Sequence, residues 1–204
     1  EYNSLTLAYE AAKNSTSETK LITVTKNHTT NAAMPTIEND QDITINLNGF
    51  TIQYTQTLIN NGKLTITDKD NTNAGTFENI NSISTPAITN VNTLTQNGGT
   101  IKGRHIAIKS EYAYAIARNP HLYLNAGKAV IENLTDSSTV AAISCSNYSN
   151  EYLDLNADYS VLVTTKDATP HAIQTCNNTT VNGGTITVNT EASGSYPSAI
   201  YRSM

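Results

Sequence analysis

Short runs in which apolar and polar residues alternate recur along the whole chain. Four clear examples are Ile45-Asn46-Leu47, Leu64-Thr65-Ile66, Leu122-Tyr123-Leu124 and Leu153-Asp154-Leu155. Alternation with a period of two places every second side chain on the same face of an extended strand. Each run therefore predicts a short β-strand that buries one face and exposes the other.

Two further patterns repeat in step with these runs. An Asn followed by small residues and then an apolar residue recurs from Asn48, Asn73, Asn97, Asn125, Asn156 and Asn182. A small or apolar residue followed by Ile recurs as Leu58-Ile59, Ala87-Ile88, Ala115-Ile116, Ala142-Ile143, Ala172-Ile173 and Ala199-Ile200. Both patterns return after roughly 28 residues, and a period of that length is typical of solenoid proteins.

The repeat predicts an all-β fold, a right-handed parallel β-helix of about six coils. Each repeat holds three strand-length segments and no segment long enough for a helix, and the Leu spacing of a leucine-rich repeat is absent. Equivalent strands of neighbouring coils are expected to stack in parallel about 4.8 Å apart. In this register Ile116 and Ile143 should be buried neighbours.

The N-terminal residues differ from the repeats. Ser4 is placed to cap a helix with an apolar stripe that includes Leu5 and Tyr9 and ends before Asn14. We therefore predict a single β-helix domain over residues 1–204, with a helical cap over 1–19 and coils over 20–204.

The C-terminal residues begin a further coil that lacks a visible cap. Such a coil would leave strand edges unpaired and Tyr196, Ile200 and Tyr201 poorly covered. We therefore expect the natural protein to continue, and the isolated chain to self-associate through its C-terminal edge.

Asn residues also recur after the segments that end in Ile. Asn tolerates the left-handed backbone of a tight corner, and its amide can bond the same amide one coil away. This recurrence predicts a structural Asn ladder made of Asn61, Asn90, Asn119, Asn147 and Asn177.

The two cysteines, Cys145 and Cys176, lie about one repeat apart, so neighbouring coils can bring them together in a disulfide. They follow their local Ala-Ile pairs by two and three residues, respectively. On ideal strands their side chains would therefore point in opposite directions. This spacing favours two separate thiols and leaves the disulfide open.

Composition and charge narrow the range of partners. Charged residues make up only 14% of the chain, the net charge is -5, and no cluster of Lys and Arg is present to bind a polyanion. Nucleic acid is therefore not expected as a partner. No apolar run approaches the roughly 18 residues needed to span a bilayer, so we expect no membrane insertion. The first residues lack the order of a signal peptide, so we expect a processed or excised piece.

The repeats resemble those of the pectin-lyase-like β-helix domains of bacterial cell-surface and adhesin-like proteins. The opening is also similar: a short Ala-rich helix, then Leu21-Ile22-Thr23-Val24, then Ile43-Thr44-Ile45-Asn46-Leu47-Asn48-Gly49, followed by Asn-Gly-Gly-Thr-Ile units. The resemblance covers nearly the whole chain and implies this fold and an extracellular location, either attached to the cell surface or secreted. It implies no single activity, because related β-helices include polysaccharide lyases, glycosidases and phage tailspikes.

Paired carboxylates on neighbouring coils would indicate lyase or glycosidase chemistry. Asp154 is predicted to face outward beside Tyr123, and Glu78 and Glu132 lie two coils apart with Lys102 between them. No carboxylate dyad emerges from this arrangement. We therefore predict no catalytic residues and no cofactor.

The segment Asp68-Lys69-Asp70-Asn71-Thr72-Asn73 places oxygen ligands at alternate positions, as calcium loops do. It lacks the Gly and the distal Glu of an EF-hand loop. The segment is therefore predicted to be a solvated turn, and no metal site is expected.

The most variable corner carries the best candidates for binding, because loops on a rigid solenoid commonly carry function. Tyr rings stack on sugars and Arg or His bonds to hydroxyl groups. The glycan-binding candidates are therefore Arg104, His105, Tyr112 and Tyr114. The alternative is that Ile106 and Ile108 form a local strand and these polar residues are solvated.

Together these features predict a non-catalytic extracellular surface or adhesion module. Its expected partner is a host or environmental glycan or a surface protein. The alternative function is that of a polysaccharide lyase or glycoside hydrolase that acts on an extracellular polysaccharide.

Overall fold

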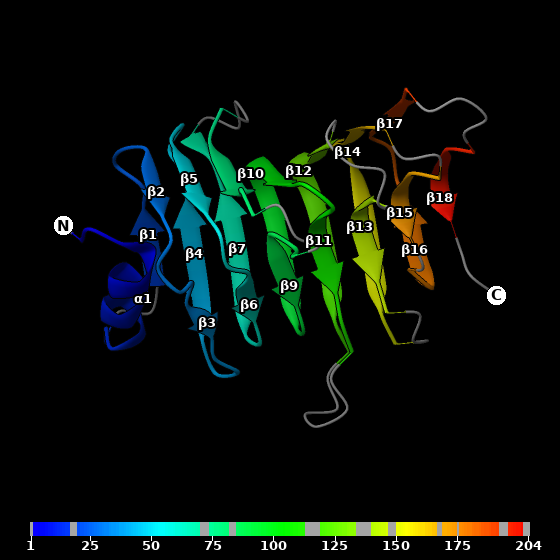
Figure 1. Cartoon of the computed structure of the whole chain (residues 1–204). Helices are drawn as coiled ribbons and strands as arrows, with labels where there is room; N and C mark the ends of the chain where they lie inside the picture. Colours follow the sequence, from blue (N-terminus) through cyan, green and yellow to red (C-terminus); the bar gives the residue numbers. More distant parts are fainter. Residues whose placement is uncertain are drawn as a thin grey trace.

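The chain folds as a parallel β-solenoid of about six turns. The computed structural model describes residues 2–16, 20–69, 74–81, 85–112, 119–133, 140–146, 150–166, 169–174, 176–191 and 196–201. Figure 1 shows the coils following one another along the axis, with the short helix α1 (Leu5–Lys13) at the N-terminal end. The predicted parallel β-helix is confirmed.

Three stacks of parallel strands form the walls. The first stack consists of β1 (Lys20–Thr23), β4 (Asp42–Asn46), β7 (Lys63–Thr67), β10 (Thr93–Gly103), β12 (His121–Asn133), β14 (Tyr152–Thr165) and β16 (Asn178–Val181). The second stack consists of β2 (His28–Thr30), β5 (Thr51–Tyr54), β8 (Thr76–Asn79), the C-terminal halves of β10, β12 and β14, and β17 (Thr185–Thr190). The third stack consists of β3 (Thr36–Ile37), β6 (Leu58–Asn60), β9 (Ile88–Asn90), β11 (Ile106–Ser110), β13 (Ala141–Cys145), β15 (His171–Gln174) and β18 (Ser198–Tyr201).

The core consists of columns of apolar side chains that run along the axis. In the first stack Leu122 and Leu153 are register partners, and both are fully buried. In the second stack Ile101 lies between Phe77 and Ala129. Because each column continues through several coils, the alternation within one strand is enough to bury its inward face.

The predicted register of the third stack is wrong at Ile143. Ile143 pairs with Ile108, which in turn pairs with Ile88. Ile116, the predicted neighbour of Ile143, lies outside the described residues. A tight turn accounts for the difference: a Cβ at Gly103 would collide with the Ile106 carbonyl, so the chain turns from β10 straight into β11. The local strand at Ile106 to Ile108 therefore occupies this place in the stack.

The predicted N-terminal cap is confirmed. Ser4 is the N-cap of α1, and its side chain accepts a hydrogen bond of 3.2 Å from the Leu7 amide. Leu5 and Tyr9 are buried on the inner side of the helix. The Tyr9 hydroxyl also accepts a hydrogen bond from the Glu38 amide, which ties the cap to the first coil.

Cys145 and Cys176 form a disulfide, with Cα atoms 4.9 Å apart. The expectation of two separate thiols is therefore wrong. It assumed that strand alternation continues to both residues, but β15 ends at Gln174. Beyond that point the alternation no longer fixes the direction of the Cys176 side chain, which can turn toward the neighbouring coil.

The C-terminal end of the solenoid exposes apolar side chains. Tyr196, Ile200 and Tyr201 are all exposed, as expected from the sequence. The strands β16, β17 and β18, which end the three stacks, contain no charged residue. Self-association through this edge stays a prediction.

Candidate functional site

A cluster of His121, Tyr123, Tyr152 and Asp154 lies on the outward face of the first stack. We call these four residues the His-Tyr patch. His121 and Tyr123 come from β12, and Tyr152 and Asp154 come from the next coil, in β14. His121 is the register partner of Tyr152, and Tyr123 is the partner of Asp154. The patch therefore consists of two outward residues from each of two neighbouring coils.

Strand alternation explains why these side chains face outward. The residues between and after them, Leu122 and Leu124 in β12 and Leu153 and Leu155 in β14, are fully buried. Each patch residue follows or precedes one of these leucines, so its side chain points away from the core. The tyrosine rings are accessible: Tyr123 is 37% exposed and Tyr152 is 39% exposed.

His121 connects the four side chains. Its Nε2–H donates a hydrogen bond of 2.9 Å to Oδ2 of Asp154. Its ring stacks on Tyr123, with centroids 3.9 Å apart and planes inclined by 15°. The centroid of the Tyr152 ring lies 5.3 Å from that of His121, with planes inclined by 27°. These contacts fix the rings side by side on a flat sheet, where they form a preorganised surface.

The backbone beneath the patch is well anchored. The His121 amide donates to the Asn92 carbonyl at 2.7 Å, and the Tyr152 amide donates to the Pro120 carbonyl at 3.0 Å. The neighbouring Glu151 is fully buried, and its Oε1 accepts hydrogen bonds from the Ser146 hydroxyl, at 2.8 Å, and the Ser146 amide, at 3.2 Å. Both strand starts are therefore held by neighbouring coils rather than by solvated loops.

Hydroxyl and amide groups flank the patch along the axis. On the preceding coil, Thr93 and Thr95 are the register partners of His121 and Tyr123. On the following coil, Asn178 and Thr180 are the partners of Tyr152 and Asp154. The outward face is therefore polar and uncharged on both sides of the patch.

A ladder of Asn side chains borders this face at the corner between the first two stacks. Asn125 donates to Asn97 at 2.9 Å, Asn156 donates to Asn125 at 2.7 Å, and Asn182 donates to Asn156 at 3.0 Å. The ladder therefore links four successive coils. It is built from the repeated Asn pattern itself and not from the residues predicted to form one.

The predicted ladder residues lie at another corner and have other partners. Asn90 accepts a hydrogen bond of 2.8 Å from Asn60 rather than from Asn61. In the next coil Ser110 occupies the position equivalent to Asn90, so the amide contact does not continue along this column.

The remaining predicted ladder residues show no common contact in the described part of the chain. Asn119 is exposed just before β12, Asn177 precedes β16, and Asn147 lies outside the described residues. Among the described residues, the recurrence of Asn after the Ile segments is therefore not matched by one ladder.

The predicted glycan-binding residues are separated by a strand. Arg104 and His105 precede β11, whereas Tyr112 follows it. His105 is buried, and the Tyr112 amide donates to Glu151 Oε1 at 3.1 Å. Tyr114 lies outside the described residues. Because β11 is about 17 Å long, the described candidates lie at opposite ends of this strand and do not form one cluster.

The predicted solvated turn begins with a buried carboxylate. Asp68 accepts hydrogen bonds from the amides of Gly49, at 2.6 Å, Gly75, at 2.7 Å, and Lys69, at 2.9 Å. Asp68 therefore satisfies backbone donors of two corners, and the solvated interpretation is wrong for this residue. Residues 70–73 lie outside the described part. Among the described residues, no group of three or more His, Cys, Asp or Glu is placed to hold a metal ion.

The outward carboxylates of the second stack are bound to one lysine. The Lys102 ammonium lies 3.2 Å from Oε1 of Glu78 and 2.8 Å from Oε2 of Glu132. Hydrogen bonds to Lys102 and its charge lower the pKa of Glu132. Gln53 also donates to Glu78 at 2.7 Å. This chain of contacts pairs both carboxylates with Lys102 and gives them a structural role.

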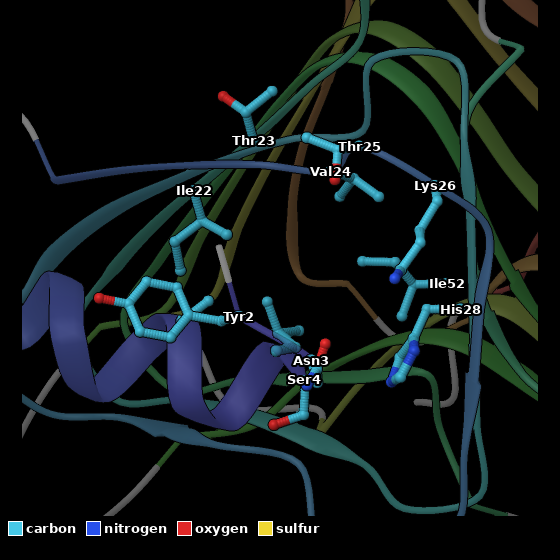
Figure 2. Close-up of a pocket in the computed structure, with 12 residues that line it drawn as sticks. Tyr2, Asn3, Ser4, Ile22, Thr23, Val24, Thr25, Lys26, His28 and Ile52 are labelled. Atoms are coloured by element: carbon cyan, nitrogen blue, oxygen red, sulfur yellow. The ribbon is translucent and has the colours of Figure 1, made fainter.

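Two hollows lie beside α1 at the N-terminal end. Figure 2 shows the smaller, of about 70 Å³, between the helix and the first coil, with Ile22, Val24, His28 and Ile52 in its lining. The larger, of about 640 Å³, is lined mainly by small and apolar residues such as Ala12 and Leu21. The smaller hollow has polar residues such as Lys26 and His28 in its lining, but its volume is far below the roughly 300 Å³ of ordinary ligand pockets. The larger is lined mainly by small and apolar residues, so the His-Tyr patch remains the candidate site.

Sequence reasoning identified Tyr123 and Asp154 as outward residues but missed His121 and Tyr152. The missed signal is the match between His121-Leu122-Tyr123 and Tyr152-Leu153-Asp154, in which two polar or aromatic residues flank a buried Leu. Aligning these triplets as neighbours brings all four residues together.

Within the described part of the chain, no helix has the length and apolar character needed to cross a bilayer. No family model, curated protein or solved structure matches the sequence or the fold of this chain.

Proposed function

We propose that this chain is a non-catalytic extracellular surface or adhesion module that binds glycans through the His-Tyr patch. The observation that carries the proposal is the pair of accessible rings, Tyr123 and Tyr152, beside the hydrogen-bonded His121 and Asp154. Aromatic faces pack against the C–H faces of sugars, and carboxylate and imidazole groups bond to sugar hydroxyls. A rigid sheet presents both kinds of group with little loss of conformational entropy on binding.

An extracellular location agrees with the disulfide between Cys145 and Cys176, because disulfides persist in oxidising compartments. The repeated patterns also lead us to propose a relationship with the pectin-lyase-like β-helix domains of cell-surface proteins. On that view, the surface protein supplies the attachment and this solenoid supplies the binding face.

The test is a glycan array probed with the wild-type chain and with the double variant Tyr123→Ala/Tyr152→Ala. The matched control is Tyr196→Ala, because Tyr196 is 78% exposed and lies at the C-terminal end. We expect the double variant to lose at least tenfold in affinity and the control to bind as the wild type does. A silent array, or equal binding by the double variant, would contradict the proposal.

A catalytic function is the second candidate because His121 and Asp154 form a hydrogen-bonded acid-base pair. Glycoside hydrolysis usually needs a second carboxyl group across the scissile bond. The described register partners of Asp154 are Tyr123 and Thr180, which favours binding over turnover. Incubating the chain with each polysaccharide that it binds distinguishes the two functions: new reducing ends or unsaturated products would establish catalysis.

A further inference from the structure

The charges around the His-Tyr patch limit the kind of glycan that it can bind. Asp154 carries a carboxylate, whereas the outward register partners on the neighbouring coils are Thr93, Thr95, Asn178 and Thr180. Lys63, in β7 of the first stack, is two coils away from His121, and its ammonium lies 4.0 Å from Oδ2 of Asp42. A uronic acid bound here would meet the carboxylate of Asp154, and the described register partners on the flanking coils would supply no compensating cation.

The same groups suit the hydroxyl groups of a neutral sugar. Oδ2 of Asp154 accepts the hydrogen bond from His121, and a carboxylate has several further acceptor positions. Threonine hydroxyls and asparagine amides on the flanking coils both donate and accept. Tyr123 and Tyr152 supply the ring faces. Each group on this face can therefore interact with a sugar that carries no charge.

The coil spacing suggests the direction of the bound chain. Equivalent positions on neighbouring coils repeat about every 4.8 Å, a spacing close to the length of a pyranose unit. The strands β10, β12, β14 and β16 are consecutive partners in the first stack. A glycan that runs along the solenoid axis therefore meets Thr95, Tyr123, Asp154 and Thr180 in turn, over about 14 Å.

We infer that the His-Tyr patch takes an uncharged, linear oligosaccharide that runs along the solenoid axis, with about one sugar unit on each coil from β10 to β16. This inference rests on the proposed glycan-binding function. It adds the charge class, the direction and the length of the ligand. The two central coils supply ring stacking, and the two outer coils supply hydrogen bonds to the end units.

Calorimetric titration with two matched series tests the inference. One series contains neutral gluco-, manno- and xylo-oligosaccharides of two to six units, and the other contains galacturonate oligosaccharides of the same lengths. We expect the affinity for at least one neutral series to rise up to about four units and then level off. The galacturonate series should bind at least tenfold more weakly at low salt, and added salt should narrow that difference.

Two variants separate the parts of the inference. Asp154→Asn should reduce the discrimination against galacturonate. The pair Thr95→Ala/Thr180→Ala should weaken binding of the four-unit ligand several-fold and leave the two-unit ligand unchanged. Thr187→Ala is the control, because Thr187 lies on β17 in the second stack.

Each outcome has a distinct meaning. If neither series binds and the array is silent, the proposed glycan-binding function fails together with the inference. If galacturonate binds as well as or better than every neutral series, glycan binding stands but the charge class is wrong. If affinity does not depend on length, or the Thr pair affects the two-unit ligand equally, the axial direction is wrong.

Discussion

The buried hydroxyl of Tyr159 donates a hydrogen bond of 2.6 Å to Oε1 of Gln96, although the two residues lie two coils apart. The Gln96 amide group donates in turn to the carbonyls of Gly99, at 2.9 Å, and Lys128, at 3.2 Å. Gly127 lies between the two side chains, where a Cβ would come within 2.6 Å of the Gln96 amide nitrogen. Gln96 therefore ties three coils together at the corner that carries the Asn ladder.

Replacing Tyr159 with Phe should destabilise the fold by about 1–3 kcal/mol, because it leaves the buried Gln96 oxygen without its donor. Burial raises the pKa of Tyr159 well above its usual range, so the hydroxyl stays a donor at every pH at which the fold is tested. The free energy of unfolding in urea measures the loss. Tyr196→Phe, at an exposed position, is the control and should be neutral. Equal stability of Tyr159→Phe and the wild type would contradict the role given to this hydrogen bond.

The Asn ladder predicts a difference between its interior and its end. Asn156 both donates to Asn125 and accepts from Asn182, whereas Asn182 makes one ladder contact and is exposed. Asn156→Ala should therefore cost about 1–2 kcal/mol of unfolding free energy, and Asn182→Ala less than about 0.5 kcal/mol. Thermal and chemical unfolding of both variants provides the comparison. Should the terminal variant lose as much stability as the interior one, the ladder would not act as a chain of neighbour contacts.

The ion pair between Lys102 and Glu132 predicts a pH dependence of stability. The Lys102 hydrogen bond, and then its charge, lower the pKa of Glu132 below its ordinary value of 4.5. The pair's contribution is therefore present above about pH 4.5 and is lost as the pH falls through the lowered pKa. Burial alone would lower the pKa of Lys102, but hydrogen bonds and charge interactions with Glu132 and Glu78 outweigh it and raise the pKa. At the alkaline end the contribution is therefore lost only as the pH rises through that raised value.

The measurement is the difference in unfolding free energy between the wild type and Glu132→Gln, taken from acid pH, below the lowered pKa of Glu132, to neutral pH. The difference should be less than about 1 kcal/mol, because the Glu132 side chain is 57% exposed and solvent screens the pair. It should also shrink in concentrated salt. A difference that grows at acid pH would have the wrong sign for this ion pair.

The disulfide between Cys145 and Cys176 should stabilise the C-terminal coils. It links residues 31 positions apart, and closing a loop of this length is worth about 3–4 kcal/mol through the entropy of the unfolded chain. We expect the double variant Cys145→Ala/Cys176→Ala to melt at a lower temperature, with no further effect of reductant. Reductant should lower the melting temperature of the wild type. If reductant lowers the melting temperature of both proteins equally, its effect does not act through this disulfide.

Sequence periodicity predicts the parts of this fold that depend on one strand or one helix end. The burial of Leu122 and Leu153 follows from alternation alone, and the Ser4 cap follows from local chemistry. Contacts between coils are harder to predict, because they depend on how many residues each corner contains. The match of His121 with Tyr152 and of Ile108 with Ile143 becomes visible only when the corner lengths are known.

The third stack offers a test of register at two adjacent residues. Leu58, and not Ile59, is the partner of Ile88, so Leu58 is fully buried while Ile59 is 39% exposed. The repeated pattern of a small or apolar residue before Ile aligns Ile59 with Ile88. The pairing of β6 with β9 instead makes Thr89 the partner of Ile59, and the Ile59 side chain faces outward from the core.

Leu58→Asp should therefore lower the unfolding free energy by about 4 kcal/mol, because it places an unpaired carboxylate in the core. Ile59→Asp should change it by less than about 1 kcal/mol, because its carboxylate stays in solvent. The two variants differ by one position and carry the same substituted residue, so each is the control for the other. Urea unfolding monitored by circular dichroism measures both. If Ile59→Asp is the more damaging variant, then β6 is shifted by one residue relative to β9, and every inward side chain of that strand would be exchanged with its outward neighbour.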